Sequence, residues 1–145
     1  MLGLMQDVPL TVDRILDHAA AWHGARELVS RDAGGHVTRS TYAQVHADAK
    51  RVSNALADAG IGFGDRVATL AWNSARHLAA WYGACGMGAV LHTLNPRLHL
   101  EQIAYIANHA GDRLLIADPA CADLVAQLLP QVPSIERVIF FCDRA

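Results

Sequence analysis

Apolar residues in the second half of the chain form short continuous runs, which alternate with longer stretches whose apolar positions recur every three or four residues. Short apolar runs between turn residues indicate buried strands, and the longer spacing indicates helices. We expect strands at residues 66–71, 89–91, 113–117 and 138–141, and helices at residues 73–87, 99–109 and 118–129. This alternation predicts an α/β fold with a mostly parallel sheet that helices cover on both faces.

The beginning of the chain carries a different pattern. A first helix is expected to start at Thr11, an N-cap residue type, and to end at Gly24. Two short extended runs, at residues 28–32 and 36–39, flank the turn sequence Ala33-Gly34-Gly35. Extended runs on either side of a Gly-Gly turn predict a small antiparallel hairpin.

The helix after the hairpin has the clearest signals in the chain. Thr41 and Gln44 have the spacing of a capping box, in which each residue hydrogen-bonds the backbone amide of the other. Gly60 is expected to end this helix, because glycine readily adopts the left-handed conformation that follows a helix. The apolar residues on one side of it predict a buried stripe made of Tyr42, Val45, Ala49, Val52 and Leu56.

Length and composition suit one compact globular unit. The chain has 145 residues, of which 52% are hydrophobic and 18% are charged, with a formal net charge of −2. This near-balance of charge argues against a nucleic-acid partner and against a polybasic membrane anchor. Three widely spaced cysteines favour a reducing compartment, and residues 1–10 lack the pattern of a signal peptide. We therefore expect a cytoplasmic protein.

The sequence lacks the common signatures of catalysis and of metal binding. The only lysine, Lys50, lies within a predicted helix, so a Walker phosphate loop is excluded. Eight histidines show no metal-ligand spacing, and a surface or capping role is expected for His77. Cys85 is expected to be a buried structural thiol. We accordingly predict no catalytic residue, no metal and no bound cofactor in these 145 residues.

Two groups of glycines are predicted to be structural. Gly60, Gly62 and Gly64 precede a strand, whereas a dinucleotide-binding fingerprint follows one, so they indicate a turn. Gly83, Gly86 and Gly88 lie at the end of a predicted helix that is rich in alanine. Small residues there are expected to allow close approach of two backbones.

The loop Asn95-Pro96-Arg97 is the most suggestive local feature. It follows the carboxyl end of a predicted parallel strand, which is the edge where open α/β sheets bind ligands. The guanidinium of Arg97 could bind a phosphate or a carboxylate. The alternative is a rigid turn that carries a surface arginine, and local sequence alone favours that alternative.

Five segments in order resemble the start of AMP-forming acyl-CoA synthetases, in particular bacterial medium- and long-chain fatty-acid-CoA ligases. They are STYAQV at residues 40–45, GIGFGDRVA at 60–68, WNSARHL at 72–78, GMGAV at 86–90 and HTLNPRL at 92–98. The resemblance covers residues 11–141. It implies that residues 1–145 are the incomplete N-terminal part of the large domain of such an enzyme.

The resemblance also implies a reaction and its partners. A fatty acid would react with ATP, with Mg²⁺ present, to give an acyl-adenylate, and CoA would then displace AMP. The family's phosphate loop and its catalytic lysine have no counterpart in this sequence, so the chain alone is expected to be inactive. Asn95, Pro96 and Arg97 would lie near the path of CoA.

Two further interpretations stay open at this point. The chain could be a free-standing, non-catalytic binding module derived from the same fold, or a self-associating structural unit. A sheet that is only partly built would expose an apolar face or a strand edge. We therefore expect a homo-oligomer.

Overall fold

A parallel sheet lies at the centre of the chain, and its strands follow the order β4–β3–β5–β6. The computed structural model describes residues 3–32 and 34–142. Within these residues the sheet consists of β3 (Arg66–Leu70), β4 (Val90–Thr93), β5 (Leu114–Ala117) and β6 (Arg137–Phe140). All three strand pairings are parallel. The predicted α/β class and the predicted parallel sheet are confirmed.

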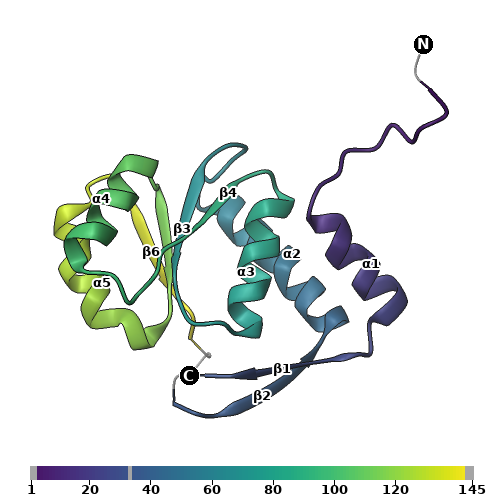
Figure 1. The fold of residues 1–145 in the computed structure, drawn as a ribbon, viewed down its shortest axis with the longest axis horizontal. Helices are drawn as coiled ribbons and strands as arrows, with labels where there is room; N and C mark the ends of the chain where they lie inside the picture. The colour runs from purple at the N-terminus through teal and green to yellow at the C-terminus, as the bar shows by residue number, and fades with distance from the viewer. Residues whose placement is uncertain (1–2, 33, 143–145) are drawn as a thin grey trace.

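Helices cover both faces of this sheet, and each face buries its own apolar cluster (Figure 1). One face packs against α2 (Tyr42–Asp58) and α3 (Ala75–Gly86), and the other against α4 (Leu100–Ala110) and α5 (Ala122–Leu128). Successive residues of a strand point to opposite faces, so both β3 and β5 contribute to both clusters. Full coverage explains why these two strands are apolar without alternation.

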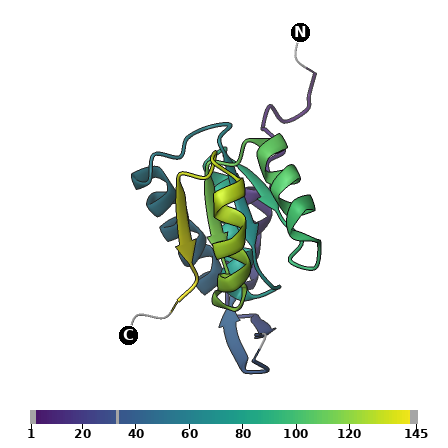
Figure 2. The ribbon, with the colours of Figure 1, turned by 90° about the vertical axis from the view of Figure 1, so that its left-hand side faces the viewer.

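The N-terminal elements lie outside this layered body. Helix α1 (Asp13–His23) packs on α2 and α3, where Leu16 joins a third apolar cluster. Strands β1 (Glu27–Arg31) and β2 (Val37–Thr41) form the predicted antiparallel hairpin, which projects from one end of the molecule (Figures 1 and 2). Of the predicted turn, Gly34 and Gly35 are described, and Ala33 lies outside the described residues.

Several predicted helix ends are confirmed in detail. The capping box of α2 forms, with the Thr41 side chain and the Gln44 side chain each accepting from the backbone amide of the other. Ser74 caps α3 by accepting from the amide of His77. Gly60 and Gly88 have φ angles of 83° and 85°, the left-handed conformation expected where a helix ends.

Other boundaries differ from the predictions. Thr11 does not cap α1: the helix begins at Asp13, its N-cap residue is Val12, and no side chain caps it. The predicted helix at 118–129 is divided: Asp118 does accept a hydrogen bond from Ala120, yet Pro119–Cys121 is a 3₁₀ turn before α5. A second 3₁₀ turn, Leu129–Gln131, follows α5.

The close packing of α2 against α3 depends on Gly83. A Cβ atom at Gly83 would lie 2.7 Å from the carbonyl oxygen of Ala49 and 2.8 Å from Val52. The hydroxyl of Ser53 bridges the same contact by donating to the Gly83 carbonyl at 2.7 Å. The prediction that small residues let two backbones approach is therefore confirmed at this position. At Gly86 the prediction is not confirmed. A Cβ atom there would have Asp13 Cβ as its nearest neighbour, at 3.5 Å, which is an ordinary van der Waals distance.

We expect Gly83→Ala to destabilise the chain by about 1–3 kcal/mol, because the added methyl group meets backbone that cannot move aside. Gly86→Ala is the matched control in the same helix. It is expected to be neutral or to stabilise by up to about 1 kcal/mol, since alanine has the higher helix propensity. Urea denaturation of both variants measures the difference, and equal stability of the two would contradict this account of the contact.

Candidate functional site

The loops after the parallel strands meet at one edge of the sheet, because parallel strands end on the same side. Two backbone hydrogen bonds hold these loops together: the amide of Leu94 donates to the carbonyl of Thr69 at 2.8 Å, and that of Asp118 donates to Leu70 at 3.0 Å. A hollow of about 390 Å³ lies between the loops after β3 and β4, and a second of about 210 Å³ lies beside it, between the start of α3 and the end of β4. Ligands of open α/β sheets bind at this edge, so it is the candidate site.

The three residues singled out in the sequence line the larger hollow. Asn95 braces the turn, since its side-chain oxygen accepts from the amide of Arg97 at 2.9 Å. The exposed guanidinium of Arg97 lies over the ring of Trp72, with Cζ 5.4 Å from the ring centroid. A cation in this position is attracted by the electron-rich face of an indole. The arginine is therefore held at the hollow by an aromatic contact, which the sequence did not reveal.

His77 connects the loop of Trp72 to the buried end of β3. Its Nδ1 lies 3.2 Å from the carbonyl oxygen of Trp72, and its Nε2 lies 2.9 Å from the hydroxyl of Thr69, which is fully buried. A carbonyl only accepts, so Nδ1 carries the proton and Nε2 accepts from the threonine. His77 lines both hollows from this position.

The environment of His77 favours its neutral form. Burial lowers the pKa of the imidazole below its ordinary value, and the Trp72 carbonyl and the charge of Asp118 oppose that shift only in part. The prediction of a surface or capping role for His77 is wrong. Its position in the first turn of α3 was visible in the sequence, but its tertiary contact with Thr69 was not.

Another histidine also has a partner that the sequence analysis missed. Nδ1 of His92, on β4, lies 2.8 Å from a carboxylate oxygen of Asp112, whose side chain is completely buried. Burial raises the pKa of Asp112, and the contact with His92 opposes that shift. Among the described residues, no three histidine, cysteine or acidic side chains gather closely enough to hold a metal ion. The pair connects β4 to the turn before β5.

The other sequence candidates are structural in this fold. Gly60, Gly62 and Gly64 form the turn into β3, where the Gly62 amide donates to Asp65 at 2.8 Å. Cys85 is half-buried, and burial raises the pKa of its thiol, which keeps it protonated and unreactive. Within the described residues, none of the helices combines the length and apolarity needed to cross a membrane.

Comparison with known proteins decides the family. The family model described as AMP-binding enzyme matches residues 16–143. The chain belongs to the AMP-binding enzyme family. A long-chain-fatty-acid–CoA ligase of Thermus thermophilus is 44% identical over 141 residues, 97% of this chain and 26% of that protein. A 3-methylmercaptopropionyl-CoA ligase of Ruegeria lacuscaerulensis is 43% identical over 144 residues, 99% of this chain and 27% of that protein.

Solved structures agree with this assignment to the AMP-binding family. The N-terminal domain of FACL13 from Mycobacterium tuberculosis matches with a TM-score of 0.79 at 28% identity, over 92% of this chain and 34% of that structure. The resemblance drawn from the five sequence segments is thus confirmed. The chain spans about a quarter of the length of the curated relatives.

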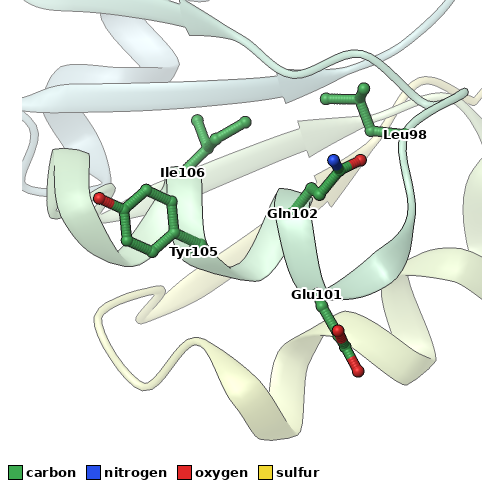
Figure 3. Close-up of a pocket in the computed structure, with 5 residues that line it drawn as sticks. All are labelled: Leu98, Glu101, Gln102, Tyr105 and Ile106. Atoms are coloured by element: carbon green, nitrogen blue, oxygen red, sulfur yellow. The ribbon is translucent and has the colours of Figure 1, made fainter.

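The chain also has an apolar hollow away from the loops that follow β3 and β4. It measures about 450 Å³ and lies along α4, where Leu98, Gln102, Tyr105 and Ile106 line it. Figure 3 shows Glu101 pointing away from Leu98 and Ile106, so the carboxylate leaves the apolar part of the hollow open. None of the polar side chains at the sheet edge takes part in this hollow.

We predict that the neutral state of His77 makes stability depend on pH. An unfolded chain binds a proton at this histidine near pH 6.5, whereas the folded chain binds it only at lower pH. Unfolding therefore takes up a proton in that window, and the free energy of unfolding falls as the pH drops below about 6.5.

His77→Gln should remove this contribution, because glutamine does not titrate. The measurement is urea denaturation of wild type and variant at pH 7.5, 6.5 and 5.5. The stability difference between the two proteins should shrink toward low pH, by at most about 1.4 kcal/mol per pH unit. The other histidines are common to both proteins and cancel. A difference that is independent of pH would show that His77 is as easily protonated in the folded chain as in the unfolded one.

Proposed function

We infer that the complete protein is an AMP-forming acyl-CoA synthetase that activates an aliphatic carboxylic acid with ATP and transfers the acyl group to CoA. Identity of 40–44% over nearly the whole chain to ligases of fatty acids and of 3-methylmercaptopropionate carries this proposal. The acids named for these relatives differ in length and chemistry, so we propose only the class, an aliphatic carboxylate.

In this proposal residues 1–145 supply scaffold and a CoA-facing loop, and the chemical steps belong to other parts of the complete enzyme. The described residues offer an arginine at the sheet edge and no cluster suited to Mg²⁺, so we assign neither adenylation nor metal binding to them. Asn95, Pro96 and Arg97 form a braced turn with its guanidinium at an open hollow. Such a turn suits a phosphate-bearing ligand such as CoA.

The proposal predicts a selective defect in CoA use when Arg97 is removed. In the complete enzyme, Arg97→Ala should raise the KM for CoA about tenfold or more, because a charge-assisted hydrogen bond is lost. The KM values for ATP and for the carboxylic acid should stay unchanged. Steady-state assays of acyl-CoA formation give all three values.

Arg51→Ala is the control for the loss of one positive charge, since Arg51 is exposed on α2 and pairs with Asp48. It should leave every KM unchanged. An unaltered KM for CoA in Arg97→Ala would reject the CoA-facing role of the loop. Absence of ATP-dependent acyl-CoA formation by the complete wild-type protein, tested over a range of aliphatic acids, would reject the proposed reaction itself.

We also infer that the isolated 145-residue chain associates with itself. Self-association is also what we expect if the chain is a free-standing, non-catalytic module instead of a part of a ligase. Strand β4 is an outermost strand of the described sheet, where it pairs only with β3, and its Val90 is 49% exposed. The apolar hollow along α4 adds uncovered surface (Figure 3). An open edge strand with exposed apolar side chains favours pairing with another chain.

Sizing with light scattering tests this association directly. We expect the mass per particle to rise with concentration from the monomer value of 15.6 kDa. Val90→Lys should lower the association, because a lysine on an edge strand opposes strand pairing. A monodisperse monomer at high concentration would contradict the prediction.

A further inference from the structure

Arg97, at the larger hollow, has a guanidinium that contacts the Trp72 ring and has no acidic partner among the described residues. Trp72 in the loop after β3 and Arg97 in the loop after β4 belong to neighbouring parallel strands, so their loops lie together. Within residues 3–32 and 34–142, the guanidinium of Arg97 forms neither an ion pair nor a hydrogen bond with another side chain. The guanidinium carbon Cζ lies over the Trp72 ring, 5.4 Å from its centroid, and Arg97 is one of the residues that line the larger hollow.

The backbone that carries the indole is anchored to the core through a chain of hydrogen bonds. Thr69 is fully buried on β3 and donates to Nε2 of His77, and Nδ1 of His77 donates to the carbonyl oxygen of Trp72. The backbone of Trp72 is thus tied to the sheet at the point where its side chain turns toward Arg97. A rigid support of this kind lowers the entropy that the arginine loses when it binds a ligand.

We propose that Trp72 is a positioning residue for CoA, which holds the Arg97 guanidinium ready to receive a phosphate group of that ligand. The proposal rests on the CoA-facing role inferred above and adds to it the residue that preorganises the arginine and the group that the arginine receives. An aromatic ring attracts the guanidinium through its charge and offers no oxygen acceptor, so the N–H donors of the arginine stay available to a phosphate. Phosphate oxygens match the planar fork of those donors. CoA offers such oxygens in its 3′-phosphate and in its diphosphate.

The test uses the complete enzyme and separates binding of CoA from catalysis. Trp72→Met keeps an apolar side chain but removes the ring, and it should raise the KM for CoA about two- to fivefold, which corresponds to the strength of an exposed cation–π contact. The kcat and the KM for ATP should not change. Trp72→Phe retains a smaller ring and should show a smaller rise, which makes it the second variant if Trp72→Met does not fold.

A double mutant shows whether Trp72 acts through Arg97. With alanine at position 97, replacing Trp72 should have no additional effect on the KM for CoA. Trp22→Leu is the matched control, since Trp22 is 75% exposed on α1 and takes no part in the sheet edge. It should leave the KM for CoA as in wild type.

The outcomes distinguish this proposal from the one on which it rests. If Arg97→Ala raises the KM for CoA but Trp72→Met and Trp72→Phe do not, the positioning role is wrong and the CoA-facing loop stands. If the Trp72 effect is as large with alanine at 97 as with arginine, the indole does not act through the arginine and the proposal is overturned. If Arg97→Ala changes nothing, both proposals fail.

Truncated forms of CoA identify the phosphate. A Trp72→Met defect that disappears with 3′-dephospho-CoA supports the proposal and assigns Arg97 to the 3′-phosphate. A defect that persists with 3′-dephospho-CoA and disappears with pantetheine supports it and assigns Arg97 to the phosphates that remain in dephospho-CoA. An equal defect with pantetheine, which has no phosphate, would overturn the proposal.

Discussion

The parallel pairing of β3 with both β4 and β5 is the constraint on which the rest of the structure depends. Thr69 is level with Thr93 on one side and with Ile116 on the other, so the chain leaves all three strands at one edge. Backbone hydrogen bonds from Leu94 and Asp118 to β3 continue the pairing one step beyond the strands. The sheet therefore determines where the loops that form the hollow begin. The sequences of the loops determine which side chains line it.

Helix packing determines where the remaining side chain of the site lies. His77 belongs to the first turn of α3, and α3 is placed by its contact with α2 at Gly83 and by the apolar cluster that it shares with the sheet. The side chain of Ser30 on the hairpin also accepts from the amide of Ala75 at 2.9 Å, which ties β1 to the start of α3. The hairpin, α2 and the sheet thus all contact α3 and fix the position of its first turn. The imidazole of His77 is therefore placed where it can form both of its hydrogen bonds.

Local signals in the sequence were sufficient to predict the helices and strands and the class of the fold. Thr41, Ser74 and Gly60 act within a few residues of themselves, so their roles follow from spacing. Thr11 failed as a cap because the helix begins beyond it, and the 3₁₀ turn at Pro119 reflects local geometry that periodicity does not register. Helix boundaries depend on backbone geometry in single turns, and that is where pattern-based prediction is weakest.

The candidate site could be predicted only in part, for a physical reason that its residues illustrate. Arg97 was found because a loop after a parallel strand has a known position relative to the sheet. Trp72 and His77 were missed because their roles depend on contacts across the sheet: the indole with an arginine 25 positions away, and the imidazole with Thr69. Such contacts leave no periodicity in the sequence.

A chain of hydrogen bonds runs from β3 to the loop at the surface and ties that loop to the interior. A buried hydroxyl at the end of an apolar strand must find a partner, since leaving it unpaired costs about 1–3 kcal/mol. His77 accepts from Thr69 and donates to the Trp72 carbonyl, so the hydrogen-bonded chain runs outward from the core and ends at the backbone of Trp72. The exposed arginine lies over the ring of Trp72. Hydrogen bonds in the interior thus hold the backbone that carries the ring, and the ring in turn contacts the arginine.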